Sequence, residues 1–245
     1  MKNIICAIFV CIVVGLISCN RSEQVKATFR HAEKIMAQHS DSALTLLSGL
    51  KNVDDFSQKD RAMYYLLLTE AENKTYVKAS SDSLVAISTE YFDQTDDYNK
   101  RAKAWYYRGR INQDLGDAPR AQDYYLNALQ NEDKVTDNAL LGRLYNSLGM
   151  LYTSQNVYEM AISYQKKAFD SFNLLNDSIG KSFVLRDISR IYSVLEKKDS
   201  ALVYCQGALL YAIDDKSKRS IYRDLANLYV DLDDFERANE YVQLF

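Results

Sequence analysis

The sequence has few residues that interrupt a helix. Its 245 residues include a single proline, Pro119, and eight glycines. Proline breaks a helix interior and glycine weakens one, so long helical segments can run without a break. The remaining composition, with 47% hydrophobic and 26% charged residues, is typical of a folded protein that buries a sizeable core. These values favour a domain built from helices.

Motifs of common enzyme classes are also missing. The sequence contains no GxGxxG, no Walker-type GxxxxGKS/T, no HExxH and no CxxC, which are local patterns of nucleotide-binding, metal-dependent and redox sites. Its two histidines, His31 and His39, have no third metal ligand at a recognisable spacing. The paired acids at 54–55 and 233–234 fall at expected turns and helix starts. We therefore expect a protein that is not an enzyme and needs neither a cofactor nor a metal.

A basic excess is absent as well. The formal net charge is −3, whereas general binding to nucleic acid or to an anionic membrane needs a surplus of lysine and arginine. We therefore expect no nucleic-acid partner.

The N-terminus carries a short apolar run. Lys2 precedes an apolar stretch from Ile4 to Ile17, which is too short for a comfortable membrane span and is typical of a signal peptide over residues 1–18. The run ends in Leu-Ile-Ser-Cys at residues 16–19, which resembles the lipobox of bacterial lipoproteins. The resemblance implies that Cys19 is lipidated and becomes the first residue after cleavage. The alternative is a signal peptide that merely contains a cysteine near its end.

These features predict how the chain is anchored. Residues 19–26 would form the lipidated cysteine and a tether, and Asn20–Lys26 reaches at most about 25 Å when fully extended. The aspartate that some bacteria read after the cysteine as an inner-membrane retention mark is absent. We expect a lipid-anchored protein of the bacterial cell envelope, on the periplasm-facing side of the outer membrane. Cys6 and Cys11 would leave with the signal peptide, so Cys205 alone would remain and no intramolecular disulfide is expected.

A short phrase recurs along the rest of the chain. Asp-Ser-Ala-Leu occurs at residues 41–44 and 199–202, and the near-copy Asp-Ser-Leu-Val occurs at 82–85. Aspartate ahead of an apolar-periodic run is typical of a helix N-cap, so each phrase predicts a capped helix start with the next apolar residue facing inward. Aligning on that residue gives a series 37 to 41 residues apart, namely Ala43, Leu84, Ala121, Ala161, Ala201 and Ala238. A period of this size indicates stacked helical hairpins.

The same phrases allow a second interpretation. Asp-Ser followed by an apolar residue resembles the acceptor of one bacterial O-glycosylation system. That resemblance implies sugar attachment at the serines of four such triplets, Ser42, Ser83, Ser178 and Ser200. Capping and glycosylation do not exclude each other.

The clearest repeat lies at residues 102–129. Trp105 stands four residues before Gly109, the turn is Gly116-Asp117, and Tyr125 and Ala128 follow. This pattern resembles the tetratricopeptide repeat (TPR). Similar units follow at 145–168, 185–208 and 222–238, and two weaker ones precede. The resemblance implies an all-α, TPR-like right-handed superhelical solenoid of about five to six helical hairpins over residues 27–245. The alternative is a plain helical bundle with accidental periodicity.

The repeats depart from the family pattern in three respects. Arg108 replaces the usual leucine, the usual proline between repeats is missing, and the period exceeds the standard 34 residues. The longer period indicates helices longer by about one or two turns. The tyrosines of the later units, such as Tyr152, Tyr192 and Tyr229, are expected to pack between helices rather than to form a stacking platform.

The family resemblance also implies where a partner binds. In TPR arrays the first helix of each hairpin lines the concave face, and partners bind at set positions on that helix. Those positions hold Lys103, Tyr106, Arg110, Arg143, Asn146, Met150, Phe183, Arg186, Arg190, Arg223 and Asn227. Guanidinium groups favour carboxylates, so we expect a protein or peptide partner with acidic or carboxylate groups. The alternative is a solvated helix face with ordinary surface arginines.

The sequence therefore favours a non-catalytic, lipid-anchored TPR scaffold that binds a protein or peptide on its concave face. An alternative is the sensory arm of a membrane-associated regulator. The chain ends in ANEYVQLF within an expected helix, which indicates either a fragment of a longer protein or a contact of Tyr241, Val242 and Phe245 with a partner, and we favour the fragment. A glycan-capture lipoprotein of the SusD-like kind is a further alternative. Such proteins are longer and carry large loops between their repeats.

Overall fold

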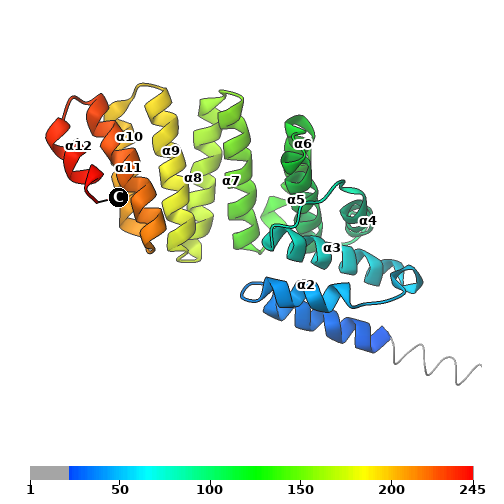
Figure 1. Ribbon diagram of the computed structural model, residues 1–245. Coiled ribbons are helices and arrows are strands. Elements are labelled where there is room, and N and C mark those ends of the chain that lie inside the picture. The colour runs from blue at the N-terminus through cyan, green and yellow to red at the C-terminus, as the bar shows by residue number, and fades with distance from the viewer. Residues whose placement is uncertain (1–21, 245) are drawn as a thin grey trace, which may run out of the picture. The chain divides into compact units, whose positions relative to one another are not determined.

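The computed structural model describes residues 22–244, which form helices joined by short connections, with no strand among them (Figure 1). A helix over residues 22–35 comes first. The helices that follow are α2 (Ser40–Ser48), α3 (Gln58–Lys74), α4 (Ser83–Phe92), α5 (Tyr98–Asp114), α6 (Ala118–Ala128), α7 (Asn138–Ser154), α8 (Tyr158–Leu174), α9 (Ser178–Val194), α10 (Lys198–Tyr211), α11 (Asp215–Asp231) and α12 (Phe235–Val242). Two short 3₁₀ turns lie at Val53–Asp55 and Glu132–Lys134. The predicted signal peptide and Cys19 lie outside the described residues.

Consecutive helices alternate between two roles. We call α3, α5, α7, α9 and α11 the A helices, and α4, α6, α8, α10 and α12 the B helices that follow them. Each A helix spans 17 residues. In the later part of the chain, α7 packs on α8, α9 on α10 and α11 on α12, and each pair contacts the next. The predicted all-α architecture of helical hairpins is confirmed.

The chain divides into two compact units, one up to Tyr124 and the other from Tyr125 onward. The first has a core around Phe29, Met36, Leu47 and Leu67, which joins the first helix, α2 and α3. The second has a core that continues through each of its helix pairs, and its fully buried large side chains include Leu140, Leu144, Leu148, Gln165, Ile188, Ile191, Ile221 and Leu225.

The inward-facing residues predicted for α2 and the B helices are correct with one exception. The five alanines are buried, with exposed fractions of 0 to 4%. Leu84, however, is 46% exposed, and Val85 is buried in its place. The reason is helix phase. Helices α2 and α10 begin one residue before their Asp-Ser pairs, whereas α4 begins at the serine of its pair, so its inward-facing residue comes one position later.

The capping prediction was wrong for the three recurrent phrases. Asp41 and Asp199 lie inside the first turns of α2 and α10, and neither these helices nor α4 has a side-chain cap. Negative charge in a first turn still favours the helix dipole. Side-chain caps stand at the start of every A helix, where Ser57, Asp97, Asp137, Asp177 and Asp214 each accept a bond from a backbone N–H three residues on, at intervals of 40, 40, 40 and 37 residues. Two B helices are capped in the same way, α6 by Asp117 and α12 by Asp234.

The ends of the A helices keep the same intervals. Each is followed by a residue in the left-handed region, with φ between 57° and 83°: Tyr76, Gly116, Asn156, Glu196 and Asp233. At every one of these turns the next amide donates to the carbonyl five residues back, as Val77 does to Glu72 and Lys197 does to Tyr192. This is the Schellman motif, which satisfies the last carbonyls of a helix.

Tyrosine pairs join the A and B helices of the second unit. Tyr152 stacks on Tyr164 with ring centroids 5.5 Å apart, and Tyr192 stacks on Tyr204 at 5.3 Å. Tyr229 stacks on Tyr241 at 5.6 Å. These rings pack between helices, as predicted.

The first helix overlaps the predicted tether. Residues 22–26 are helical, and Val25 is 6% exposed and belongs to the core of the first unit. The reach of an extended chain therefore does not apply to this part of the tether. None of the helices within residues 22–244 has the length and apolar character needed to cross a bilayer.

Candidate functional site on the A helices

The predicted partner-binding residues of the second unit lie on α7, α9 and α11. Helices α7 and α9 are in contact, and side-chain hydrogen bonds connect α9 to α11. Repeating A helices thus bring the predicted residues of successive hairpins onto neighbouring elements. The structure shows which of them are occupied by contacts within the chain and which are exposed.

Arg186 joins α9 to α11. Its Nη1 donates to Ser220 Oγ over 2.7 Å, and its guanidinium lies 5.3 Å from the centroid of the Phe183 ring. Burial and the neighbouring charge of Arg190 lower the pKa of Arg186. The buried Nε atom has no hydrogen-bond partner within the described residues. This side chain is therefore first of all an inter-repeat contact.

Arg190 makes a second connection between the same helices. Its Nη2 and Nε donate to Asp224 Oδ2 over 2.9 and 3.2 Å, and Nη1 lies 3.9 Å from Asp187 Oδ1. Burial raises the pKa of Asp187, although the charges of Arg186 and Arg190 oppose that rise. Carboxylates therefore alternate with the predicted arginines. The dipeptide Arg-Asp at 186–187 and again at 223–224 indicates these carboxylates in the sequence, but the prediction considered only the arginines.

Arg223 and Asn227 are the exposed members of this group. The side chain of Arg223 is 57% exposed, and within the described part of the chain its nearest carboxylate is that of Asp224, at 4.0 Å. Asn227 is exposed one turn further along α11. It lines a hollow of about 150 Å³ between α9 and α11, together with Ser189, Arg190, Ser193, Asp224, Leu228 and Asp231. This hollow has donors and acceptors on both walls.

The residues on α7 are partly buried. Asn146 Nδ2 lies 3.8 Å from Met150 Sδ, a weak acceptor, and its Oδ1 is buried without a hydrogen-bond partner. Arg143 is also partly buried one turn earlier. Met150 and Phe183, which the repeat pattern places on the same face, are 48% and 44% exposed.

In the first unit, two of the three predicted residues serve the fold. Lys103 Nζ forms an ion pair with the buried Glu70 of α3 at 3.0 Å, and Tyr106 is only 6% exposed. Arg110 donates to Gln113 and Asp114 on its own helix, over 3.2 and 3.3 Å. It also lines a hollow described below.

Arg108, which replaces the usual leucine of the repeat, has a structural partner. Its Nε donates to Asp82 Oδ2 over 2.7 Å, and Asn112 Nδ2 donates to the same oxygen over 3.2 Å. The guanidinium also lies 4.6 Å from the ring centroid of Tyr124. Burial opposes ionisation of Asp82, but these hydrogen bonds and the charge of Arg108 outweigh burial and lower its pKa. Asp82 therefore holds α5 rather than capping α4.

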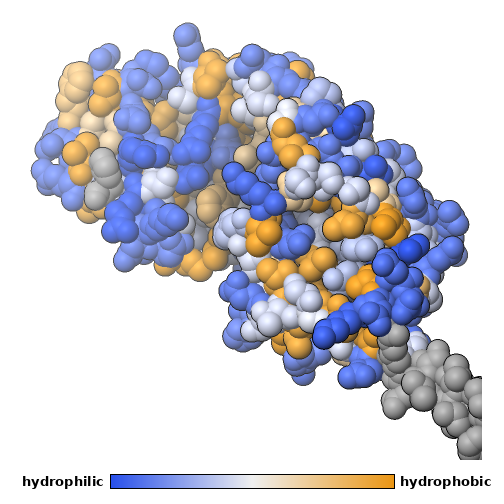
Figure 2. Space-filling model, turned by 45° about the vertical axis from the view of Figure 1, so that its right-hand side comes forward, coloured by the Kyte–Doolittle hydropathy of each residue, from blue (hydrophilic) through white to orange (hydrophobic). Residues whose placement is uncertain are grey.

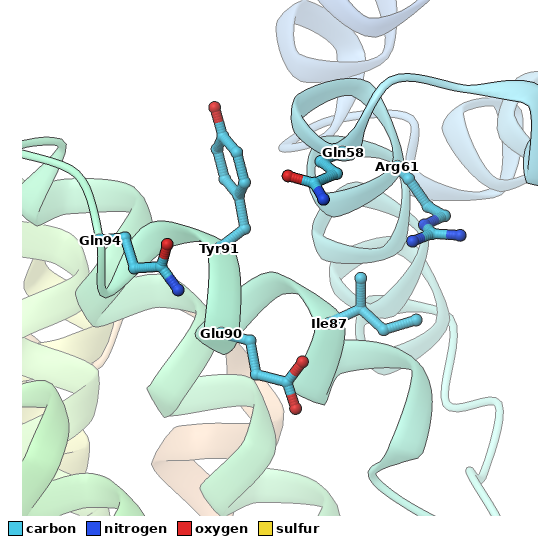
Figure 3. A pocket seen from close by; sticks show the side chains of 6 residues that line it. All are labelled: Gln58, Arg61, Ile87, Glu90, Tyr91 and Gln94. Atoms are coloured by element: carbon cyan, nitrogen blue, oxygen red, sulfur yellow. The ribbon is translucent and has the colours of Figure 1, made fainter.

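Polar side chains line hollows at several places in the first unit. Figure 3 shows one of about 170 Å³, with Gln58 and Arg61 on α3 facing a row of residues from α4 and the turn that follows it. That row is Ile87, Glu90, Tyr91 and Gln94. A single carboxylate and a guanidinium that points away from it do not make an acid–base pair.

Another hollow of this unit is larger, at about 490 Å³. It is lined by the end of α3, the residues that follow it and the end of α5, namely Asn73, Lys74, Tyr76, Val77, Lys78, Arg110 and Asp114. Of this set, the repeat pattern predicted only Arg110. In the sequence, the large apolar residues Tyr76 and Val77 stand between Lys74 and Lys78, and the structure shows that both are exposed.

The remaining predicted residues are two histidines and four serines. His31 and His39 are both exposed on or beside the first helix. Across residues 22–244, no three potential metal ligands of the His, Cys, Asp and Glu types come together. Ser42 and Ser83 are exposed, whereas Ser178 and Ser200 are partly buried. On the face shown in Figure 2, hydrophobic residues are interspersed with hydrophilic ones.

Comparison with known proteins agrees with this architecture. Residues 100–174 match the model of the tetratricopeptide repeat. A curated relative, the uncharacterized protein ycf37 of Cyanophora paradoxa, is 32% identical over 95 residues, which are 38% of this chain and 50% of that protein. The chain thus spans about half the length of the curated relative that it matches.

Solved structures show the same fold. A signal transduction ATPase of the STAND class with a tetratricopeptide repeat sensor, from Pyrococcus horikoshii, superposes with a TM-score of 0.70 at 18% identity, over 91% of this chain and 35% of that one. A Rap protein complexed with competence and sporulation factor superposes with a TM-score of 0.66 at 15% identity, over 91% and 64%. The chain therefore has a TPR-like solenoid fold. Folds of this class are scaffolds suited to protein–protein interaction.

Proposed function

We propose that this chain is a non-catalytic, lipid-anchored TPR scaffold of the bacterial cell envelope that binds an acidic segment of a partner protein on its A helices. The observation that carries the proposal is the exposed pair Arg223 and Asn227 beside the hollow between α9 and α11. TPR folds offer extended surfaces for such segments.

The contacts within the chain assign different roles to the arginines. Arg186 and Arg190 are bonded to Ser220 and Asp224, so they position α11 against α9. Arg223 makes no such short contact with residues 22–244 and can turn its guanidinium toward a carboxylate of the partner, a planar pairing that arginine makes well. Asn227 can hydrogen-bond a peptide backbone through its donor and its acceptor. Together they form a short recognition element on one face of α11.

The anchoring part of the proposal is supported by the sequence. The apolar run that ends in Leu-Ile-Ser-Cys at residues 16–19 fits a lipoprotein signal. Since residues 22–35 are helical and join the core of the first unit, a lipid on Cys19 would hold this end of the folded chain close to the bilayer.

The test uses photocross-linking in the native envelope. A photoreactive amino acid replaces Asn227 on α11 in one variant and Lys166, an exposed residue of α8, in the control. Cross-linking of a defined acidic segment through position 227, and its loss when Arg223→Glu is added, is the expected result. Capture through position 166 alone, or capture that Arg223→Glu leaves unchanged, would reject the α11 site.

The anchor is tested separately. The wild-type protein is expected to incorporate labelled palmitate, and Cys19→Ser is expected to abolish that labelling. Labelling of the serine variant equal to that of the parent would contradict lipid attachment at Cys19.

A further inference from the structure

The connection from α3 to α4 differs from the other connections between A and B helices. It runs over residues 75–82, whereas the others have three residues each, at 115–117, 155–157, 195–197 and 232–234. The additional residues follow Val77, directly after the Schellman turn at the end of α3. The first unit therefore carries a longer loop beside the ends of two A helices.

The residue at this turn is unusual for its conformation. Tyr76 has φ 59°, in a region where glycine is the residue of lowest strain. At the equivalent positions the chain has Gly116, Asn156, Glu196 and Asp233. Tyr76 is also 92% exposed, and Val77 beside it is 49% exposed. The left-handed backbone itself belongs to the Schellman turn that recurs at every A-helix end. What sets Tyr76 apart is a large aromatic ring with almost none of its surface buried, which contributes nothing to the core.

The loop forms a wall of the 490 Å³ hollow. Asn73 and Lys74 come from the end of α3, Arg110 and Asp114 come from the end of α5, and Tyr76, Val77 and Lys78 come from the loop. The lining thus contains three cations and one carboxylate, and that carboxylate is paired with Arg110 at 3.3 Å. An exposed aromatic and aliphatic pair beside a cationic lining complements a ligand that has both an apolar side chain and negative charge.

We infer that this hollow is a second recognition site, which takes an acidic peptide segment with an aromatic or large aliphatic side chain flanked by carboxylates. The apolar side chain packs on Tyr76 and Val77, and the carboxylates meet Lys78, Lys74 and Arg110. The inference rests on the proposed function in that both require an acidic protein segment as the partner, but it concerns a different unit and different residues.

The test measures the binding of a short fluorescent peptide in which one phenylalanine is flanked by glutamates. Saturable binding to the purified protein is expected by fluorescence anisotropy. Tyr76→Gly removes the ring but suits the left-handed turn, so it is expected to weaken binding by roughly tenfold or more and to raise the melting temperature. A ring that served only the fold would lower that temperature on removal. Lys78→Glu is expected to weaken binding to a similar extent, and Glu196→Gly, the matched change in the second unit, to leave it unchanged.

Three results would overturn the inference. They are no saturable binding, binding that Tyr76→Gly and Lys78→Glu leave intact, and equal binding of a peptide with serine in place of phenylalanine, which would indicate simple charge attraction. Arg223→Glu is measured in parallel. Peptide binding that is lost only in the Arg223 variant would support the site on α11 and reject this one. Binding that is lost only in the Tyr76 and Lys78 variants would support this site and show that the peptide does not use α11.

Discussion

At the scale of single residues, the ring of Phe172 leaves no room for a β-carbon at two neighbouring glycines. This ring is 8% exposed and lies against two glycines, Gly142 on α7 and Gly180 on α9. A β-carbon at either glycine would come within 2.6 to 2.7 Å of the ring. Because Gly142 and Gly180 both lie against the Phe172 ring, the ring has little room to move away from a methyl group added at either position.

Replacing Gly180 by alanine is therefore expected to destabilise the protein. Overpacking of this kind lowers the free energy of unfolding by about 1–3 kcal/mol. Gly207→Ala in α10 is the matched control, because its β-carbon would have Leu185 Cδ1 at 3.5 Å, an ordinary contact. Relief of the glycine penalty should stabilise that helix by about 0.5–1 kcal/mol. Urea unfolding followed by circular dichroism would show the two shifts, and a Gly180→Ala variant as stable as the parent would contradict the packing argument.

The ion pair between Asp82 and Arg108 predicts a pH dependence. The pKa of Asp82 is lower in the folded than in the unfolded chain, so its contribution to stability is present above the ordinary carboxyl pKa of about 4 and is lost as the pH falls through the folded value. Asp82→Asn leaves Arg108 and Asn112 with a weaker hydrogen-bond acceptor. We expect the free energy of unfolding to fall by about 1–3 kcal/mol at pH 7. The difference between variant and parent should narrow as the pH falls below about 4. Unfolding midpoints measured at several pH values would test this, and a difference independent of pH would contradict it.

At the scale of helices, the structure separates two kinds of aspartate that look alike in the sequence. Asp177 caps α9 by accepting a bond from the Gly180 amide over 2.9 Å. Asp199 lies inside the first turn of α10 and makes no such bond. Asp177→Ala should therefore lower the free energy of unfolding by about 1 kcal/mol. Asp199→Ala should cost only about 0.3–1 kcal/mol through the helix dipole, and less in high salt. Equal effects of the two changes at high salt would reject the assignment of caps.

The helices themselves were predictable because their information is local. The buried alanines at 161, 201 and 238 recur at a period that only stacked hairpins explain. Which aspartate caps a helix was not predictable from that pattern, since an N-cap and a first-turn position are one or two residues apart and both favour negative charge. The exposure of Leu84 has the same origin, a small shift in where α4 begins.

The candidate sites were predictable to a smaller extent. The repeat pattern assigned Arg186, Arg190 and Arg223 to A helices correctly, because element and position are properties of the local sequence. It did not predict that Asp224 would pair with Arg190, since that contact spans 34 residues and depends on how α11 packs on α9. Tyr76 was not identified, because its backbone angle is a property of the folded turn.

At the scale of the whole molecule, Cys205 reports on the integrity of the second unit. It is fully buried in α10 and is the free cysteine of the described residues. Burial raises the pKa of its thiol to about 12, so the reactive thiolate is scarce at neutral pH. We expect iodoacetamide to modify the peptide that contains Cys205 only in urea, in step with the loss of helical circular dichroism. Rapid modification of the folded protein, measured by mass spectrometry, would show that α10 and α11 separate without unfolding.

The regular spacing of caps and turns has a consequence for how such a chain can change in length. Three successive steps of 40 residues link Ser57 to Asp177 at the helix starts, and three more link Tyr76 to Glu196 at the turns. Inserting a few residues inside a helix would rotate its buried face away from its neighbour. Inserting or deleting a whole 40-residue block between equivalent positions would instead leave each helix with its cap, its turn and its buried face in the usual register. The chain is in this sense a series of exchangeable modules, and recombination between blocks changes the number of modules while each keeps its own cap and turn.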